Sequence, residues 1–411
     1  MKTLYLVHDL SDAGVHKRVA MLQSGGAEIT LAGFRRTPDP ITSIAGCTAI
    51  DFGQTYNGSF IQRIRAVLRI FFFLRSNLSP SLRAKQSNPD AASAAQEEAY
   101  HAHGALTGLP RRFAPRNDGR WFDIDLIIAR NLEMLAIGTR AKSVPLVYES
   151  LDIHRLLLKN TPTGWLLRYL EGRLSKRASL LITSSPAFIN DYFHKRSNVT
   201  LPALLIENKI HNPPPATTQR PAALPWIIGW FGIIRCRKSL EMLAELVRKS
   251  DGNVQVVIRG KPAHDQFDDF HKAIDETPGL QFLGPYENPA DLAAIYGAVH
   301  FNWAVDMYEE NQNSAWLLPN RIYEGGLYGA IPIALGNVET GKFLKQLGIG
   351  AILSSTTSKE LISFFKRLTP AYYQSLCHAI NRLPKETWAY TEQDCKDFVH
   401  RLESLTDNPH G

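Results

Sequence analysis

Short apolar runs alternate with helical stretches along both halves of the chain, and this rhythm limits the possible folds more than any other feature. The apolar runs cover residues 4–7, 29–34, 124–129, 145–148, 180–183 and 204–206 in the first half and 226–231, 254–259, 281–283 and 331–335 in the second. Helical stretches are expected at 15–23, 163–176, 240–249, 267–274, 291–296 and 385–405. Runs this short and apolar suit parallel strands that are covered by helices on both faces. The sequence therefore predicts an α/β protein with two doubly wound units.

A proline-rich segment separates the two units. Residues 212–221 include three consecutive prolines, a composition typical of linkers. A chain of 411 residues is long enough for two domains. We predict a first domain at 1–205, a linker at 206–225, a second domain at 226–384, and a C-terminal helix and tail at 385–411.

The alternation is interrupted at residues 78–120, which are rich in Ala, Ser, Asn, Pro and Arg. A loop of this length is unusual inside a compact domain, so we expect a largely disordered insertion without catalytic residues. The preceding stretch, 61–75, is apolar, contains four arginines and has no acidic residue. It is compatible with a helix on an anionic membrane surface, but a domain helix whose arginines extend into water is the favoured interpretation.

The formal net charge of +7 favours anionic partners such as phosphate groups, an anionic membrane or nucleic acid. Nucleic-acid binding is not expected, because the cations are scattered and aromatic residues for stacking are sparse in the basic insertion. The four cysteines lie far apart, so neither a metal site nor a disulfide is expected, and a reducing compartment fits. The chain has no signal-peptide core and no apolar run of about 18–20 residues, which predicts a cytoplasmic protein.

Residues 311–335 place a polar loop, a helix and a short apolar strand in succession. Pro319 suits the first turn of that helix, where its missing N–H would have no partner anyway, and Glu324 then lies in the early turns. The N-terminus of a helix attracts anions. A carboxylate beside it can accept hydrogen bonds from two adjacent hydroxyl groups, such as those of a ribose.

Family 4 glycosyltransferases have a donor-site segment that resembles Pro319-Asn320-Arg321-Ile322-Tyr323-Glu324, followed by Gly329 and Pro332-Ile333-Ala334. The resemblance implies the GT-B fold, in which two Rossmann-like domains face each other across a cleft and a C-terminal helix crosses back onto the first domain. It implies that the first domain binds the acceptor and the second binds a sugar nucleotide. In that family the glutamate at the position of Glu324 holds the ribose of the donor.

A second basic segment follows the first strand after the linker. The family usually has a Gly-Arg pair here and a lysine six residues after the glycine, and Lys238 has that spacing from Gly232. Ile233 stands where the arginine is expected, so Arg235 is the nearest replacement. Arginine and lysine can neutralise the diphosphate of the donor as the sugar leaves. We therefore predict Arg235, Lys238 and Glu324 as catalytic residues and Gly232 as a substrate contact.

The sequence departs from the family at its acidic pair. Many members have a glutamate eight residues before the one at Glu324, and this chain has Trp316 there. Acidic and polar side chains slightly upstream can contact the sugar hydroxyls instead. The substrate-binding candidates in this half are Glu309 or Glu310, Asn313, Ser314, Asn320 and Arg321.

In the first half, the candidates follow predicted strands and so are expected at the cleft. Gly14, in the first turn, either lets the chain approach the donor or is an ordinary turn residue. Glu149, Asp152 and His154 follow the strand at 145–148 and are substrate-binding candidates, beside the alternative of a structural role. Residues 184–186 end another strand and are expected to line the same cleft.

The resemblance implies transfer of a sugar from a nucleoside diphosphate to a saccharide or lipid-linked acceptor, with retention of configuration. No metal or further cofactor is expected, because Arg235 and Lys238 supply the positive charge. The family analogy points to bacterial surface-polysaccharide synthesis, with the enzyme peripheral at the inner face of an anionic membrane. Two alternatives remain open: a GT-B sugar-nucleotide epimerase, and a non-catalytic sugar-nucleotide-binding partner of another transferase.

Overall fold

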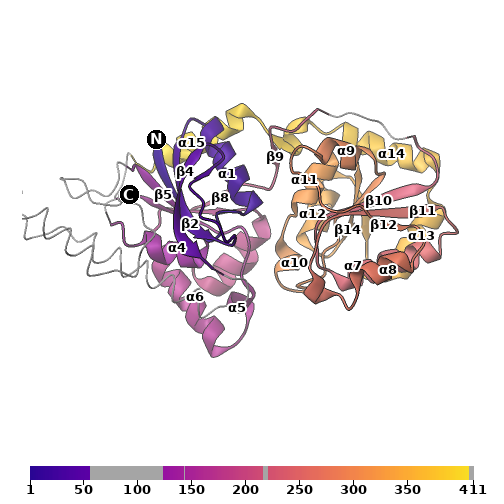
Figure 1. The fold of residues 1–411 in the computed structure, drawn as a ribbon, viewed down its shortest axis with the longest axis horizontal. Coiled ribbons are helices and arrows are strands. Elements are labelled where there is room, and N and C mark those ends of the chain that lie inside the picture. The colour runs from indigo at the N-terminus through magenta and orange to yellow at the C-terminus, as the bar shows by residue number, and fades with distance from the viewer. Residues whose placement is uncertain (56–123, 143, 216–220, 407–411) are drawn as a thin grey trace, which may run out of the picture.

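The computed structural model describes residues 1–55, 124–142, 144–215 and 221–406 of the chain. The insertion predicted at 78–120 and the helical stretch predicted at 61–75 lie outside these ranges. The described residues form two α/β domains that lie side by side (Figure 1).

The first domain is built on a sheet with the strand order β3-β4-β2-β1-β5-β6-β7-β8. All its pairings are parallel except that of β3 with β4. Its strands are β1 (Lys2–Val7), β2 (Glu28–Arg35), β3 (Ser43–Ile44), β4 (Cys47–Gln54), β5 (Leu126–Arg130), β6 (Leu146–Glu149), β7 (Leu180–Thr183) and β8 (Ala203–Leu205). Its helices are α1 (Ala13–Ser24), α4 (Asn131–Gly138), α5 (Arg155–Leu158), α6 (Pro162–Ser175) and the π-helix η2 (Phe188–Ser197).

Each face of this sheet has its own hydrophobic core. On one face Val7 and Ile128 pack with residues of α1, whereas on the other Leu6 and Ala129 pack with residues of α4. Burial on both faces explains why the strands appear in the sequence as continuous apolar runs instead of alternating ones.

The second domain has an all-parallel sheet with the order β12-β11-β10-β13-β14-β15. Its strands are β10 (Trp226–Ile234), β11 (Val254–Pro262), β12 (Leu280–Phe282), β13 (Phe301–Trp303), β14 (Ile331–Leu335) and β15 (Ala351–Leu353). Its helices are α7 (Arg237–Arg248), η3 (His264–Gln266), α8 (Phe270–Asp275), α9 (Leu292–Gly297), α10 (Asn313–Trp316), α11 (Asn320–Leu327), α12 (Glu339–Leu347), α13 (Ser358–Arg367) and α14 (Pro370–Asn381).

The C-terminal segment crosses back onto the first domain, as predicted. Helix α15 (Glu392–Glu403) packs on α1, and its Phe398 and Leu402 belong to the same core as Val7. The prediction of one continuous helix over 385–405 was wrong. The segment contains the 3-10 turn η4 (Lys385–Thr387) and the strand β16 (Ala389–Tyr390) before α15 begins. A new helix starts there because Thr391 and Asp394 form a reciprocal capping box.

The predicted linker contains regular structure. Strand β9 (Ile210–His211) lies within 206–225 and pairs in parallel with β16. The two segments where the chain passes between the domains are therefore hydrogen-bonded to each other, and no pattern of apolar residues indicated this.

The strand predicted at 226–231 and the helix predicted at 240–249 both have different bounds. β10 continues to Ile234, and α7 already begins at Arg237. The strand continues beyond Gly232 because Gly232 and Gly260, its partner in β11, both adopt positive φ angles, of 110° and 133°. A Cβ on Gly260 would lie 1.8 Å from the Gly232 carbonyl oxygen, so only glycine allows this pairing.

No helix in the described ranges combines the length and the apolar character needed to cross a membrane.

Candidate active site

The carboxyl ends of the two parallel sheets meet between the domains. In the segment after β6, the Ile153 backbone N–H donates to Oδ1 of Asn313 at 3.2 Å, and Nδ2 of Asn313 donates to Oδ1 of Asp152 at 3.4 Å. In the segment after β7, the Ser185 hydroxyl donates to the Trp316 carbonyl oxygen. Ligands of open parallel sheets bind outside the carboxyl ends of the strands. We call the segments that follow β1, β5, β6, β7, β10 and β13, together with α11, the interdomain site.

Arg235 follows β10 directly and is held between neighbouring strand ends. Its Nη2 lies 3.5 Å from Oδ2 of Asp306, and its guanidinium stacks 4.7 Å from the ring centre of Tyr308. Burial alone would raise the pKa of Asp306, but Arg321 and Arg235 and hydrogen bonds from the loop hold it below its usual value. Arg235 is therefore a charged, oriented and still partly exposed cation at the position that the sequence predicted for the missing family arginine.

Lys238 lies in the first turn of α7 and forms an exposed ion pair with Glu310. The structure thus joins a predicted catalytic cation to a predicted sugar contact, and Glu310 is directed at Lys238. Exposed ion pairs contribute little to stability. A phosphate group can consequently replace the Glu310 carboxylate beside Lys238.

Gly232 has open space on the side where a Cβ would stand, with no atom within 4 Å of that position. Its positive φ is explained by the strand pairing described above. The open space is compatible with the predicted approach of a donor to the backbone at this point.

Glu324 is buried within α11, and its orientation is set by two neutral donors. Nδ2 of Asn288 donates to Oε1 at 2.9 Å, and the Tyr296 hydroxyl donates to Oε2 at 2.9 Å. Each carboxylate oxygen accepts one of these bonds and has capacity for another. The arrangement can therefore hold two adjacent hydroxyl groups without moving the side chain.

The glycines after Glu324 serve packing. A Cβ on Gly325 would lie 2.5 Å from the amide of Asn302, and one on Gly326 would lie 2.5 Å from the Trp388 ring. Because these two glycines have no side chain, α11 packs close to β13 and to the C-terminal crossing segment.

Lys17 of α1 is a residue of the first domain that interacts electrostatically with Glu324 of the second. Its Nζ donates to the Asn208 carbonyl oxygen at 2.6 Å. Burial lowers the pKa of Lys17 to about 8, and the negative charge of Glu324 opposes that shift. The sequence analysis did not identify Lys17, because it occupies an ordinary helical position and its neighbours come from the other half of the chain.

The remaining candidates of the second domain mainly hold the loop between β13 and α11. The Ser314 hydroxyl donates to Oδ1 of Asp306 at 3.1 Å and accepts from the Glu309 backbone N–H at 3.0 Å. Nη1 of Arg321 donates to the Trp303 carbonyl oxygen at 3.1 Å. Asn320 is exposed at the start of α11.

Asp152 and His154 lie at the entrance of the interdomain site on the first-domain side. Asp152 remains accessible to solvent, but the atoms of both domains around it raise its pKa by desolvation, while its hydrogen bond from Asn313 acts in the opposite direction. His154 is exposed and caps α5, with Nδ1 accepting from the Leu156 backbone N–H at 3.3 Å.

Glu149 lies beneath this surface. It is 0% exposed, Nε of Arg18 donates to it at 2.7 Å, and Tyr5 donates its hydroxyl proton to the other oxygen. Both oxygens are thus engaged inside the domain, and Glu149 does not face a ligand. Nε of Arg130 lies 4.0 Å from Glu149, which makes Glu149 a residue that positions Arg130.

Arg130 is a further site residue that the sequence analysis missed. It ends β5, and its Nη1 donates to the Tyr5 hydroxyl oxygen at 3.3 Å. Its Nη2 lies 3.5 Å from Oδ1 of Asp12, the N-cap of α1. A Cβ on Gly14 would lie 3.0 Å from both Arg130 and Asp12, so the glycine leaves room for this pair. The sequence did contain a signal for this residue, because Arg130 stands directly after the apolar run at 124–129.

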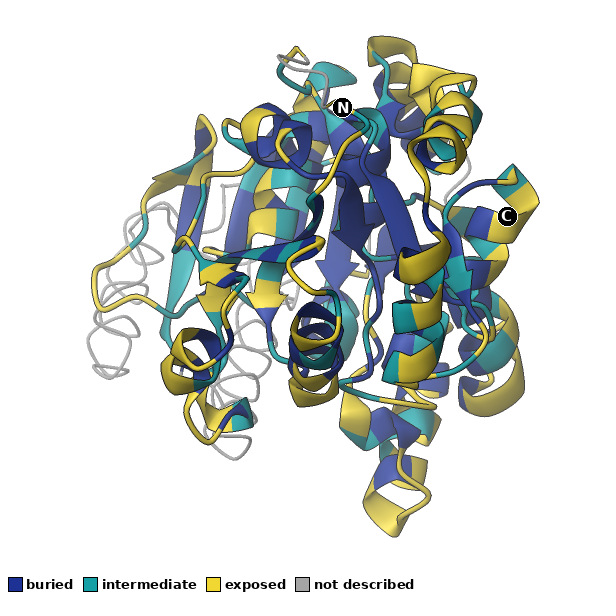
Figure 2. Cartoon of the chain, turned by 90° about the vertical axis from the view of Figure 1, so that its right-hand side faces the viewer, coloured by how far each residue is buried: buried dark blue, intermediate teal, exposed yellow. Residues whose placement is uncertain are grey.

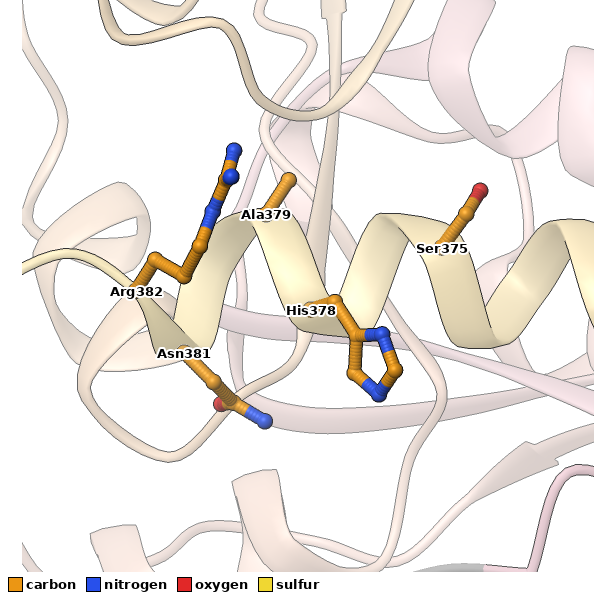
Figure 3. A pocket seen from close by; sticks show the side chains of 5 residues that line it. All are labelled: Ser375, His378, Ala379, Asn381 and Arg382. Carbon is orange, nitrogen blue, oxygen red and sulfur yellow. The ribbon is translucent and has the colours of Figure 1, made fainter.

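A shallow depression of about 450 Å³ lies elsewhere, on α14 (Figure 3). It is lined by Ser375, His378, Ala379, Asn381 and Arg382. All five come from one helix or its end, so this hollow is separate from the strand ends that form the interdomain site.

Comparison with known proteins places this geometry in a family. No protein-family model matches the chain. Over 420 residues the chain is 42% identical to the succinoglycan biosynthesis protein ExoL of Rhizobium meliloti strain 1021, covering 99% of this chain and 94% of ExoL. Sucrose-phosphate synthase from Thermosynechococcus elongatus has a similar structure, with a TM-score of 0.67 and 14% identity over 99% of each chain. Anabaena HepE in complex with UDP and glucose matches with a TM-score of 0.62 and 15% identity, over 98% of this chain and 99% of that one.

The structural matches establish the fold, and the match to ExoL establishes the family, because high identity extends over nearly the full length of both proteins. The predicted resemblance to the GT-B glycosyltransferases is confirmed. The chain belongs to the family of the succinoglycan biosynthesis protein ExoL and has the GT-B glycosyltransferase fold.

Proposed function

We propose that the protein transfers a sugar from a nucleoside diphosphate sugar, bound by its second domain, to a saccharide or lipid-linked acceptor bound by its first. One observation supports this most directly: Arg235 and Glu324, from segments far apart in the sequence, both lie at the interdomain site, with Glu324 oriented by Asn288 and Tyr296. The pair offers a cation for a diphosphate and a carboxylate for a diol.

Membership of the ExoL family makes the protein a glycosyltransferase of surface-polysaccharide biosynthesis, and neither the epimerase nor the non-catalytic alternative is favoured. HepE has been solved with UDP and with UDP-glucose. By analogy we propose a UDP-sugar as the donor, which specifies the base of the sugar nucleotide.

The proposed mechanism uses positive charge where negative charge develops. As the bond between the sugar and the diphosphate breaks, Arg235 and Lys238 stabilise the leaving diphosphate through charge-assisted hydrogen bonds. Lys238 becomes available when phosphate replaces Glu310. Because these side chains supply the charge, we propose a reaction that needs no metal ion, with retention of configuration as in the family that the motif resembles.

The proposed acceptor binds against the first domain, near Asp152 and Arg130. Asp152 is accessible, and its raised pKa makes it a more effective proton acceptor than an ordinary aspartate. A hydroxyl of the acceptor placed here would face the sugar held by the second domain. We propose that the enzyme works at the cytoplasmic face of a membrane, where a lipid-linked acceptor is located.

Isothermal titration calorimetry with a panel of nucleoside diphosphates and sugar nucleotides tests this proposal. We expect one base to bind preferentially, and we expect Arg235→Ala and Glu324→Ala each to weaken its binding at least about tenfold. Arg237→Ala is a matched control, because Arg237 is exposed and forms its bidentate pair with Asp268 instead. Folded protein that binds no member of the panel, or that binds equally well in all variants, would disprove the donor site.

A further inference from the structure

Helix α6 exposes its large apolar side chains. Trp165, Leu166, Tyr169 and Leu170 are 64%, 49%, 54% and 39% exposed, and the rings of Trp165 and Tyr169 stack with their centres 5.9 Å apart. Their spacing along the helix places them on one face. The helix lies with α5 at the lower end of the first domain (Figure 1), and exposed residues occur beside buried ones at the lower end of the rotated view (Figure 2).

The opposite face of α6 packs on the domain through small and polar residues together with the partly buried Leu167 and Leu174. A Cβ on Gly164 would lie 2.2 Å from the Lys159 carbonyl oxygen, and one on Gly172 would lie 2.7 Å from that of Ser197. Glu171 between them is buried and accepts hydrogen bonds from two tyrosine hydroxyls. A surface helix normally packs its apolar face inward. In α6 Leu167 and Leu174 pack inward, whereas the four large apolar side chains of the exposed stripe are left largely in solvent.

Exposed cations precede the stripe, at the two ends of α5, and follow it, at the C-terminal end of α6. They are Arg155, Lys159, Arg173, Lys176 and Arg177. Across residues 153–179 the sole acidic residue is the buried Glu171. Within this segment the surface is thus positive and apolar at once.

We propose that this α6 surface, formed by Trp165, Leu166, Tyr169, Leu170 and the five cations before and after them, docks the first domain on an anionic lipid bilayer. Leucines can enter the acyl region, tryptophan and tyrosine rings suit the boundary between acyl chains and headgroups, and lysine and arginine attract lipid phosphates. A protein partner would be expected to offer acidic residues to these cations, and it is an alternative that the test distinguishes.

The surface lies close to the interdomain site. α5 follows Asp152 and His154 in the chain, and Nη1 of Arg168 in α6 donates to the carbonyl oxygens of Leu157 at 2.6 Å and Lys159 at 3.0 Å. Docking through α6 would hold the first-domain side of the site near the bilayer. That consequence for a lipid-linked acceptor rests on the proposed function, whereas the lipid contact itself does not.

Sedimentation of the full chain with vesicles of equal parts phosphatidylglycerol and phosphatidylcholine measures the contact without any substrate. We expect binding to these vesicles and much weaker binding to pure phosphatidylcholine. Leu166→Gln/Leu170→Gln should weaken binding at least about tenfold, through loss of apolar insertion. The matched control Leu283→Gln/Tyr372→Gln removes side chains that are 55% and 46% exposed in the second domain and should bind like the wild type.

The charge is tested in the same way. Arg173→Gln/Lys176→Gln should weaken binding by roughly tenfold or more, since each cation near an anionic surface contributes about fivefold. Lys359→Gln/Lys366→Gln, a pair of exposed lysines on α13, is the control with the same change in net charge and should leave binding nearly unchanged.

Fluorescence quenching by brominated lipids identifies the residue in contact. Trp165 is the one tryptophan classed as exposed in the described ranges, and Trp226, Trp230 and Trp303 are at most 1% exposed. Bromolipid should quench the tryptophan fluorescence of the wild type, whereas Trp165→Phe should still bind vesicles and lose most of the quenching.

Failure of the wild type to bind, or equal binding by the α6 variants and their controls, would overturn the proposal. So would self-association without lipid that the α6 variants abolish, because the surface would then be a protein interface. Donor binding measured by calorimetry without lipid is independent of these results.

Discussion

The two domains use charged side chains differently at the site between them. In the first domain, Arg18, Arg130 and Glu149 are at most 8% exposed and satisfy one another. In the second, Arg235 and Lys238 are 35% and 58% exposed, and the acid paired with Lys238 is itself exposed. A buried charge that loses its partner is strongly destabilised, whereas an exposed one exchanges partners easily. The first domain therefore uses charge to hold its strand ends in place, and the second presents charge to a ligand.

The largest expected effect is on the rate of sugar transfer, and it tests whether Arg235 presents its charge to the donor. Arg235→Ala should lower kcat/KM by about 10²–10³, because it removes an oriented cation from the leaving diphosphate. Sugar transfer measured with the donor identified by calorimetry checks this, with Arg237→Ala as the control. If Arg235→Ala retained wild-type activity, the replacement of the family arginine by Arg235 would be wrong.

The second prediction concerns stability in the first domain. Arg130→Met should lower the free energy of unfolding by about 3 kcal/mol, since it leaves the buried Glu149 and the Tyr5 hydroxyl with one cation fewer. Urea unfolding measures the change. Lys238→Met, the corresponding change in the second domain, should leave the midpoint unchanged because that pair is exposed. Equal effects of the two substitutions would refute the contrast between the domains.

Glu171, a buried acid of the first domain, should make the free energy of unfolding depend on pH. Burial raises the pKa of Glu171 to about 7 from 4.5, so the native state binds this proton more tightly than the unfolded state does. Its contribution is fully present below pH 4.5 and is lost as the pH rises through about 7, an effect on the order of 3 kcal/mol.

Glu171→Gln should therefore gain stability relative to the wild type between pH 4.5 and 7, and the difference should level off above that range. Urea unfolding of both proteins at several pH values provides the comparison. A difference that does not change with pH would show that Glu171 is not protonated preferentially in the native state.

The smallest expected effect is a gain. Glu310→Gln should strengthen donor binding by roughly two- to threefold, because the donor phosphates no longer compete with a carboxylate for Lys238. Calorimetry with the preferred nucleotide measures it, and Glu287→Gln, an exposed change of equal charge in the same domain, is the control. Weaker binding by Glu310→Gln would instead indicate that Glu310 contacts the donor directly.

The second-domain half of the site was largely accessible from the sequence because its residues are local. Gly232, Arg235 and Lys238 surround the end of one strand, and Glu324 follows Pro319 within one helix turn or two. Such segments keep their spacing when they fold, so a motif can be recognised before the structure is known. The first-domain half has no such motif, because Asp12, Arg130 and Asp152 lie at or just after the ends of three different strands. They come together only at the carboxyl edge of the sheet.

The sequence by itself determined the alternation of strands and helices and the two α/β units, because short apolar runs buried on both faces leave few other arrangements. The return of the C-terminal helix was implied by the resemblance to the GT-B glycosyltransferases. Tertiary structure decided which charges are buried and which are available. Glu149 turned inward to Arg18, Glu310 turned to Lys238, and α6 packed through Gly164, Glu171 and Gly172. A residue type states what a side chain can bind, but its partners depend on distances between segments that only packing brings together.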